Sequence, residues 1–420
     1  MNPGSRLLAN TRVTLVAWVL VLATAAPQAW GDGSLLIVGG ALQEDNAAVH
    51  RALVDAMLPE GKMVIIPVAS GRPAESAADF VRSLEKYGLS RDRIAVYPLA
   101  VRDDDATADV DESAWSKNAW NEESVSAVSG AAGFWFTGGD QMRITQTLLG
   151  EDGGESPLLV LIRERLARGA VVGGSSAGAA IMSRDMIAGG ISFTALLEPL
   201  ASDYSDTEDQ DSGRLYLSRG LGFFPKSVID QHFDRKARLG RLVRALAATG
   251  QPLGFGIDEN TALHVRLGDN RARVLGGGSV TALDASNAKF DFGSTRLASG
   301  LEISVIPAGV TFSTTDLSPL EGPGDATVGK EYFGYTPEAG GGMAFANPRL
   351  DQALGFDLMD NEARRLDRYS IDERGRVLIY RFSQTESSKG FWRSEGSADR
   401  YTISKVRFDI IALQTELPPH

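Results

Sequence analysis

The sequence contains no cysteine. This absence excludes disulfide bonds, thiol nucleophiles and thiolate metal sites, so the fold must be held by its core alone. Histidine is also scarce, because 420 residues include only His50, His232, His264 and His420. Basic residues (42) are outnumbered by acidic residues (54), which gives a net charge of −12. This balance argues against nucleic acid as the main partner.

Long apolar runs are rare, and one of them stands near the N-terminus. Arg6 and Arg12 precede VTLVAWVLVLATAA, which is followed by small residues. The pattern predicts a signal peptide over residues 1–31, with cleavage after ATA or AWG. The protein is then expected to be secreted, to the periplasm or the medium, without stable membrane insertion after cleavage. A buried core helix and a retained anchor are the alternatives, and the run is short for a membrane span.

Short apolar segments alternate with helical segments through the first half of the chain. Strands are predicted within 34–41, 62–70, 93–99, 131–140 and 169–178, and a helix over 74–88. This alternation predicts an α/β fold, in which a mostly parallel sheet lies between helices in a three-layer arrangement. Ligands bind such sheets beyond the carboxyl ends of the strands, where these segments end in glycine, serine or proline.

The pattern changes after about residue 261, where short β-like segments begin. A stretch rich in glycine and proline, residues 318–342, indicates a linker or surface excursion. We therefore predict a catalytic domain over 33–316 and an accessory β-rich C-terminal region over 317–420. The acidic segment 203–214 is interpreted as a solvated loop, and attraction of a cationic substrate is the alternative.

The segment VVGGSSAGAAIM, residues 171–182, contains the pattern G-x-S-x-G between an apolar strand and a small-residue helix. This is the context of a nucleophile elbow, in which Ser176 is displayed on a strained turn and Ser175 shapes that turn. Ordinary tight packing is the alternative. A phosphate loop is disfavoured because the Lys-Ser/Thr ending of a Walker motif is absent.

A serine nucleophile needs a general base and a carboxylate that orients it. His232 is the best candidate for the base, since it stands where a strand-like segment gives way to polar residues. Asp258 and Glu259 follow another short strand, and the sequence does not choose between them. The order serine, histidine, acid differs from that of α/β-hydrolases and disfavours that fold.

Four segments, FTGGDQMR, GGSSAGAAIM, IDQHFDRKARLGRL and GIDENTAL, occur in this order. Together they resemble the cyanophycinases, serine peptidases related to dipeptidase E. The resemblance spans residues 33–315 and implies a fold similar to class I glutamine amidotransferases and flavodoxin. It also implies cleavage of cyanophycin, a poly-aspartate carrying arginine on each side-chain carboxylate, to β-Asp-Arg dipeptides. A homodimer is expected, and no metal or cofactor.

The resemblance also assigns roles to residues. It implies Ser176 as nucleophile, His232 as base and Glu259 as orienting acid, with the amides of Gly139 and Ala177 as the oxyanion hole. The residues that it implies in substrate binding are Gln141, Asp230, Gln231, Arg238 and Arg241. Without the resemblance, the sequence predicts that Arg238 and Arg241 lie on a solvated basic face of a helix. The functional alternatives are a dipeptidase E-like or isoaspartyl peptidase acting on small peptides, and a catalytically silent polymer-binding protein.

Overall fold

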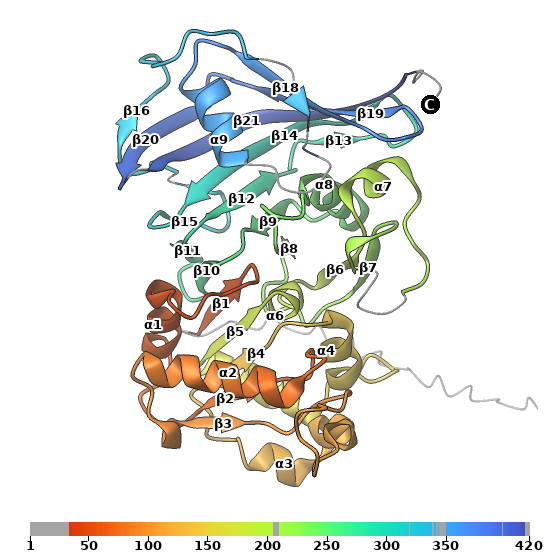
Figure 1. Cartoon of the computed structure of the whole chain (residues 1–420), viewed down its shortest axis with the longest axis vertical. Helices are drawn as coiled ribbons and strands as arrows, with labels where there is room; N and C mark the ends of the chain where they lie inside the picture. The colour runs from red at the N-terminus through yellow and green to blue at the C-terminus, as the bar shows by residue number, and fades with distance from the viewer. Residues whose placement is uncertain are drawn as a thin grey trace, which may run out of the picture.

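A computed structural model describes residues 33–204, 210–318, 320–337, 340–341, 343, 350–396 and 398–415. The predicted signal peptide and His420 lie outside the described residues. The chain forms two large sheets, with helices packed on both faces of the first and against the second (Figure 1). Among the described residues, no helix combines the length and the apolar character that crossing a membrane requires.

The first sheet has eight strands within the described residues, in the order β15-β11-β10-β1-β5-β4-β2-β3. Its strands are β1 (Ser34–Val38), β2 (Met63–Ile66), β3 (Ile94–Val96), β4 (Gly133–Phe136), β5 (Val171–Ser175), β10 (Thr261–Arg266), β11 (Arg271–Gly276) and β15 (Thr311–Ser313). Strands β1 to β5 pair in parallel, whereas β10, β11 and β15 are antiparallel at one edge. The five strands expected from the sequence are therefore confirmed.

Helices cover both faces of the first sheet. Two helices, α1 (Ala47–Asp55) and α2 (Pro73–Lys86), share a buried cluster with Trp135 on one face. The other face packs against α3 (Glu122–Ser126), α4 (Gln141–Leu148), α5 (Pro157–Ala167) and α6 (Ala177–Ala180). This part of the chain also contains two 3₁₀ helices, η1 (Arg91–Arg93) and η2 (Glu112–Trp120). This arrangement confirms the three-layer α/β prediction.

The second sheet has eleven strands within the described residues, and its main path runs β17-β18-β19-β21-β14-β12-β9-β8. Its strands are β8 (Ser227–Asp230), β9 (Leu253–Ile257), β12 (Ser279–Asp284), β13 (Lys289–Phe290), β14 (Arg296–Pro307), β16 (Asp325–Ala326), β17 (Gly340–Gly341), β18 (Arg365–Ile371), β19 (Arg376–Ser383), β20 (Lys389–Glu395) and β21 (Ala398–Gln414). The remaining elements are the two-stranded sheet of β6 (Asp185–Gly189) and β7 (Tyr216–Arg219), the helices α7 (Ser192–Leu197), α8 (Leu239–Thr249) and α9 (Leu350–Leu354), and the π-helix η4 (Gly355–Met359).

The β-rich C-terminal region, which the sequence predicts, extends this second sheet. Strand β21 pairs antiparallel with β14, with Ile303 opposite Val406 and Val305 opposite Ile403. Residues of both strands share one buried cluster with α7 and α8. The predicted domain boundary between residues 316 and 317 stays a prediction, although the sheet itself continues across it.

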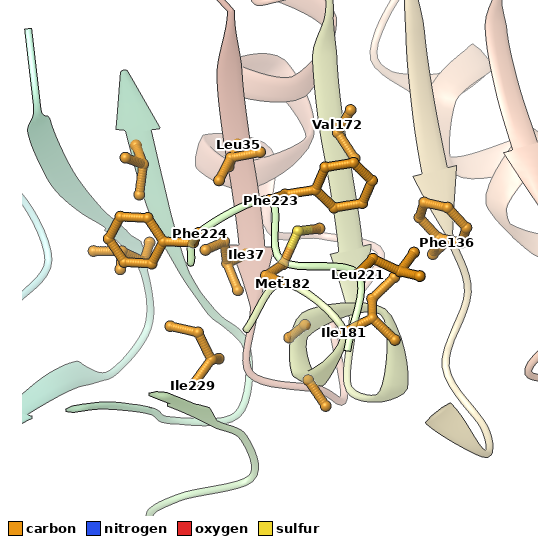
Figure 2. Packing of buried hydrophobic residues seen from close by; sticks show 14 of the residues in the cluster. Leu35, Ile37, Phe136, Val172, Ile181, Met182, Leu221, Phe223, Phe224 and Ile229 are labelled. Carbon is orange, nitrogen blue, oxygen red and sulfur yellow. The ribbon is translucent and has the colours of Figure 1, made fainter. Parts of the chain in front are cut away.

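A hydrophobic core packs against α6. Ile181 and Met182, which follow this helix, are fully buried and belong to the same cluster as Phe136 of β4. Figure 2 shows them between the parallel strands of the first sheet on one side and Phe224 and Ile229 on the other. Phe224 precedes β8, and Ile229 lies in it. Close packing of the residues in and after α6 thus holds the preceding turn in place.

Tyr380 of β19 connects the C-terminal strands to α8. Its side chain is fully buried, and among the described residues its hydroxyl has no hydrogen-bond partner. A methyl group added to Gly240 of α8 would lie 2.4 Å from this hydroxyl oxygen and 2.7 Å from Leu196 Cδ1. Glycine is therefore required here by the close approach of the C-terminal strands.

This contact can be tested by a double-mutant cycle. Gly240→Ala is expected to lower the free energy of unfolding by about 1–3 kcal/mol through overpacking. Tyr380→Phe should leave it unchanged or raise it, since an unpaired buried hydroxyl costs about 1–3 kcal/mol. The double variant should recover part of the loss in thermal and urea unfolding, and strictly additive effects would contradict the contact.

Candidate active site

Ser176 lies at the sharp turn between β5 and α6. Its φ of 55° and ψ of −106° are unusual for a residue other than glycine. Such a conformation costs about 1–3 kcal/mol and persists only where the surroundings enforce it. Here the Ser176 N–H donates to Val38 O at 3.0 Å. The predicted nucleophile elbow is present in geometry, with the side chain partly exposed.

The two glycines of the G-x-S-x-G pattern are required by close packing. A Cβ on Gly174 would lie 2.7 Å from Gly178 Cα, and one on Gly178 would lie 2.5 Å from Phe136 O. Larger residues at either position would force the strand and the helix apart. Ser175 is the last residue of β5 and pairs with Val38, consistent with a role in shaping the turn.

His232 follows β8 and faces Ser176. Its Nε2 lies 2.9 Å from Ser176 Oγ, so the hydroxyl can donate to this nitrogen when the imidazole proton is on Nδ1. The His232 N–H donates to Gly39 O at 2.6 Å. A Cβ on Gly40, which has a φ of +105°, would lie 2.3 Å from the imidazole. These contacts fix the imidazole from the end of β1.

Glu259 and not Asp258 contacts the histidine. Glu259 Oε1 lies 2.7 Å from His232 Nδ1, while its own N–H donates to Asp234 Oδ1 at 3.0 Å. Asp258 instead accepts a hydrogen bond from the Ser279 N–H at 2.9 Å. Of the two acids that the sequence leaves open, Glu259 is the one hydrogen-bonded to the imidazole. The structure places serine, histidine and glutamate in one hydrogen-bonded chain.

The electrostatic surroundings keep this imidazole neutral. Burial lowers the pKa of His232 below its ordinary value of 6.5, the hydrogen bond with Glu259 raises it, and the charges of Arg238 and Lys236 lower it again. The net direction is downward. At neutral pH the Nε2 lone pair is thus free to accept the Ser176 proton, which is the first requirement of nucleophilic catalysis.

Of the two amides expected in an oxyanion hole, that of Ala177 directly follows the serine, and Gly139 follows Gly138, which lies close to Ser176. Ala177 opens α6, and amides in the first turn of a helix have no acceptor within the helix. Gly138 and Gly139 follow β4, and a Cβ built on Gly138 would lie 3.4 Å from Ser176 Cβ. Gly139 has a φ of +138°, and a side chain there would collide with Ala69 O at 2.0 Å.

Arg238 and Arg241 are buried, so the interpretation of a solvated basic helix face is wrong. Both side chains are 3% exposed. Arg241 donates to the two carboxylate oxygens of Asp230 at 2.6 and 2.8 Å. Arg238 donates to Gln231 O at 2.7 Å and pairs with Asp211. The implied role of Asp230 in binding a substrate stays a prediction, and here both of its oxygens accept from Arg241.

The two glutamines occupy different positions. Gln231 Oε1 lies 3.5 Å from Ser176 Oγ, so the structure brings this residue to the nucleophile. Gln141 Nε2 instead donates to the backbone of β6, to Ala188 O at 2.7 Å and Ile187 O at 3.3 Å. Its buried Oε1 has no partner among the described residues. Within that part of the chain, no group of acidic and histidine side chains is arranged to hold a metal ion.

Comparison with known proteins gives the family. Residues 35–273 match peptidase family S51. The chain belongs to this family. It is a serine-type peptidase, which confirms the family that the four sequence segments indicate.

The relatives of this S51 peptidase include proteins named cyanophycinase. The one from Nostoc sp. is 33% identical over 281 residues, which cover 66% of this chain and 80% of the relative. The one from Geminocystis herdmanii is 31% identical over 254 residues, which cover 60% and 80%. A crystal structure of a peptidase from an acI-B1 actinobacterium is 22% identical and covers 68% of this chain and 98% of its own, with a TM-score of 0.44.

Three residues around the site of this S51 peptidase are missed by the sequence reasoning. Asp211, in the acidic segment interpreted as a solvated loop, pairs with both Lys236 and Arg238. Burial would raise the pKa of Asp211, but these two cations outweigh it and lower the pKa to about 2. Asp234 holds the Glu259 amide, and Gly40 makes room for the imidazole. Of these three residues, only Gly40 could have been found from the sequence, because it is a glycine that follows a buried strand closely.

The pH dependence of the nucleophile follows from the lowered pKa of His232. Labelling of Ser176 by a fluorophosphonate should rise with pH through an inflection below 6.5 and then stay flat, because only the neutral imidazole accepts the proton. Glu259→Gln should slow labelling at pH 8 by about 10³- to 10⁴-fold. It should also move the inflection to lower pH. Asp258→Asn is the matched control, and an equal loss there would contradict the assignment.

Gly40 offers a second test. Gly40→Ala places a methyl group within the imidazole and demands a left-handed backbone, so His232 should be displaced from Ser176. Fluorophosphonate labelling is expected to fall by about 100-fold or more, since a misplacement of about 1 Å costs that much. The circular dichroism spectrum should be unchanged. Labelling at the rate of the unmodified protein would show that residue 40 does not position the base.

Proposed function

We propose that this protein degrades cyanophycin as a serine-type peptidase. The observation that carries the proposal is the hydrogen-bonded chain of Ser176, His232 and Glu259 at the junction of the two sheets. Two further facts support it: the match to peptidase family S51, and the relatives named cyanophycinase. The substrate is the point at which the proposal goes beyond family membership.

In the proposed mechanism, Ser176 Oγ attacks the carbonyl carbon of an aspartyl backbone amide as its proton passes to His232 Nε2. The oxyanion accepts hydrogen bonds from the amides of Gly139 and Ala177. The C–N bond then breaks, and the leaving nitrogen takes the proton from His232. Water hydrolyses the resulting ester by the same route in reverse, which releases a β-Asp-Arg dipeptide and restores the serine.

The polar residues beside the serine would hold the substrate. We assign direct contact to Gln231, whose amide oxygen lies closest to the nucleophile of the predicted binding residues. Asp230 and Arg241 act as positioning residues, because they bind each other bidentately and fix the strand that leads to His232. Burial and the neighbouring Arg241 lower the pKa of Arg238 to about 10, so it stays cationic at neutral pH and keeps its pairs with Asp211 and Asp230.

Export and dimer formation are part of the same proposal. The basic residues and apolar run before residue 27 support export through a signal peptide. N-terminal sequencing of the protein from the medium and periplasm tests this. The homodimer stays a prediction from the family resemblance, and light scattering of the purified protein tests it.

The proposed activity is tested with purified cyanophycin and mass spectrometry of the products. The unmodified protein should release β-Asp-Arg dipeptides, and Ser176→Ala should lower the rate by about 10³-fold or more. Ser286→Ala, at an exposed serine remote from the site, is the matched control and should retain the full rate. Full activity of Ser176→Ala would overturn the mechanism. Rapid cleavage of small Asp-X dipeptides without release from the polymer would favour a dipeptidase E-like or isoaspartyl peptidase instead.

A further inference from the structure

A second pocket opens beside the nucleophile, on the face of the first sheet that carries α1 and α2. It has a volume of about 470 Å³. We call it the α1–α2 pocket, and its lining includes Glu44, Glu75, Asp79, Arg72, Thr137 and Trp135. It shares no lining residue with the Asp230–Arg238–Arg241 cluster, which belongs to β8 and α8.

The α1–α2 pocket reaches the reaction centre. Ser175 and Gly138 both line it, and Ser175 is the residue directly before the nucleophile. A Cβ built on Gly138 would lie 3.4 Å from Ser176 Cβ. The pocket therefore extends to the residue directly before the nucleophile.

Thr137 supplies an unused hydrogen-bonding group. The residue is only 4% exposed, and among the described residues its hydroxyl has no partner. Phe134 and Phe136 of β4 face one buried cluster and Trp135 faces the other. Because side chains alternate along a strand, Thr137 continues on the side of Trp135, toward the pocket. Buried hydroxyls are nearly always paired, so the unpaired hydroxyl of Thr137 beside this pocket is available to a bound group.

The charge of the α1–α2 pocket is negative. Three carboxylates line it, from Glu44, Glu75 and Asp79, against the single guanidinium of Arg72. Arg72 is 71% exposed and pairs with Glu75, and Asp79 is 52% exposed in its pair with Arg82. Exposed pairs of this kind contribute about 0–1 kcal/mol, so a bound cation can displace them at little cost.

Aromatic side chains complete the pocket. Phe80 and Trp135 both line it and stack with their ring centroids 4.3 Å apart and an interplanar angle of 8°. A guanidinium is the side-chain cation that best matches this combination, because it binds carboxylates through paired N–H groups and stacks on aromatic faces. It also donates to a hydroxyl such as that of Thr137.

We propose that the α1–α2 pocket is a subsite for an arginine side chain of the peptide substrate, next to the bond that Ser176 cleaves. This inference rests on the proposed function and adds a second point of recognition to it. The guanidinium lies between the carboxylates of Glu44 and Asp79, with one N–H directed to the Thr137 hydroxyl. The substrate is thereby held on the α1–α2 side as well as on the β8–α8 side of the nucleophile.

Binding is measured apart from hydrolysis, by calorimetry on the Ser176→Ala protein. The probes are Nα-acetyl-L-arginine amide and its neutral isostere, Nα-acetyl-L-citrulline amide. The arginine probe should bind about tenfold or more tightly, and the double variant Glu44→Gln/Asp79→Asn should remove that preference. Glu85→Gln, an exposed carboxylate on α2 outside the pocket, is the matched control and should change nothing. Equal binding of the two probes, or an unaffected double variant, would overturn the proposal.

Thr137→Val separates a ligand role from a structural one. Removing an orphan hydroxyl should leave the melting temperature unchanged or raise it. Affinity for the arginine probe should fall at the same time, by about threefold to tenfold. Unchanged affinity would show that the hydroxyl faces no ligand.

Steady-state kinetics on cyanophycin give the final readout. The double variant should raise KM about tenfold or more with little change in kcat, because the subsite holds ground state and transition state alike. A fall in kcat without a change in KM would contradict the subsite. Failure of the proposed function has a different signature: the unmodified protein would release nothing from the polymer, while the arginine probe would still bind to the Ser176→Ala protein.

Discussion

The active-site geometry depends on the end of strand β1. The carbonyl oxygens of residues 38, 39 and 40 accept, in that order, the N–H groups of Ser176 at 3.0 Å, His232 at 2.6 Å and Asn260 at 2.9 Å. Asn260 directly follows Glu259, so one three-residue segment is bonded to all three loops of the triad. Each bond contributes about 0.5–1.5 kcal/mol to stability, but their greater effect is to fix three loops against one rigid strand.

The same strand end joins the two sheets. Ser176 follows β5 of the first sheet. His232 and Glu259 follow β8 and β9, which pair in parallel in the second sheet. A Cβ on Gly39 would lie 2.2 Å from Asp258 O, so the sheets meet at backbone contact. The triad is therefore correctly spaced only when the two sheets are correctly packed. The C-terminal strands extend the second sheet and contact α8 through Tyr380. They therefore contribute to the packing on which the spacing of the triad depends.

Local patterns in the sequence predict the strands, α2 and the serine turn, because each depends on residues close together in the chain. Contacts between distant segments are not predictable in this way. Asp258 and Glu259 are neighbours of the same type, and only the backbone path after β9 decides which one reaches His232. The burial of Arg241 depends on Asp230, and that of Arg238 on Asp211 from a loop that reads as solvated. Charge patterning identifies these residues but not their partners.

The nucleophile lies between two surroundings of opposite character, and this has consequences for recognition. On the β8–α8 side the charges of Arg238 and Lys236 act on His232, and on the α1–α2 side three carboxylates and one guanidinium line the pocket. Under the proposed function, a polymer that carries both a guanidinium and a carboxylate on each repeat would be attracted in one orientation and repelled in the reverse one. Like charges brought together cost several kcal/mol, so repulsion as well as weaker attraction would disfavour the reversed orientation. Electrostatics would then set the direction of the proposed substrate through the site, before its carbonyl reaches Ser176.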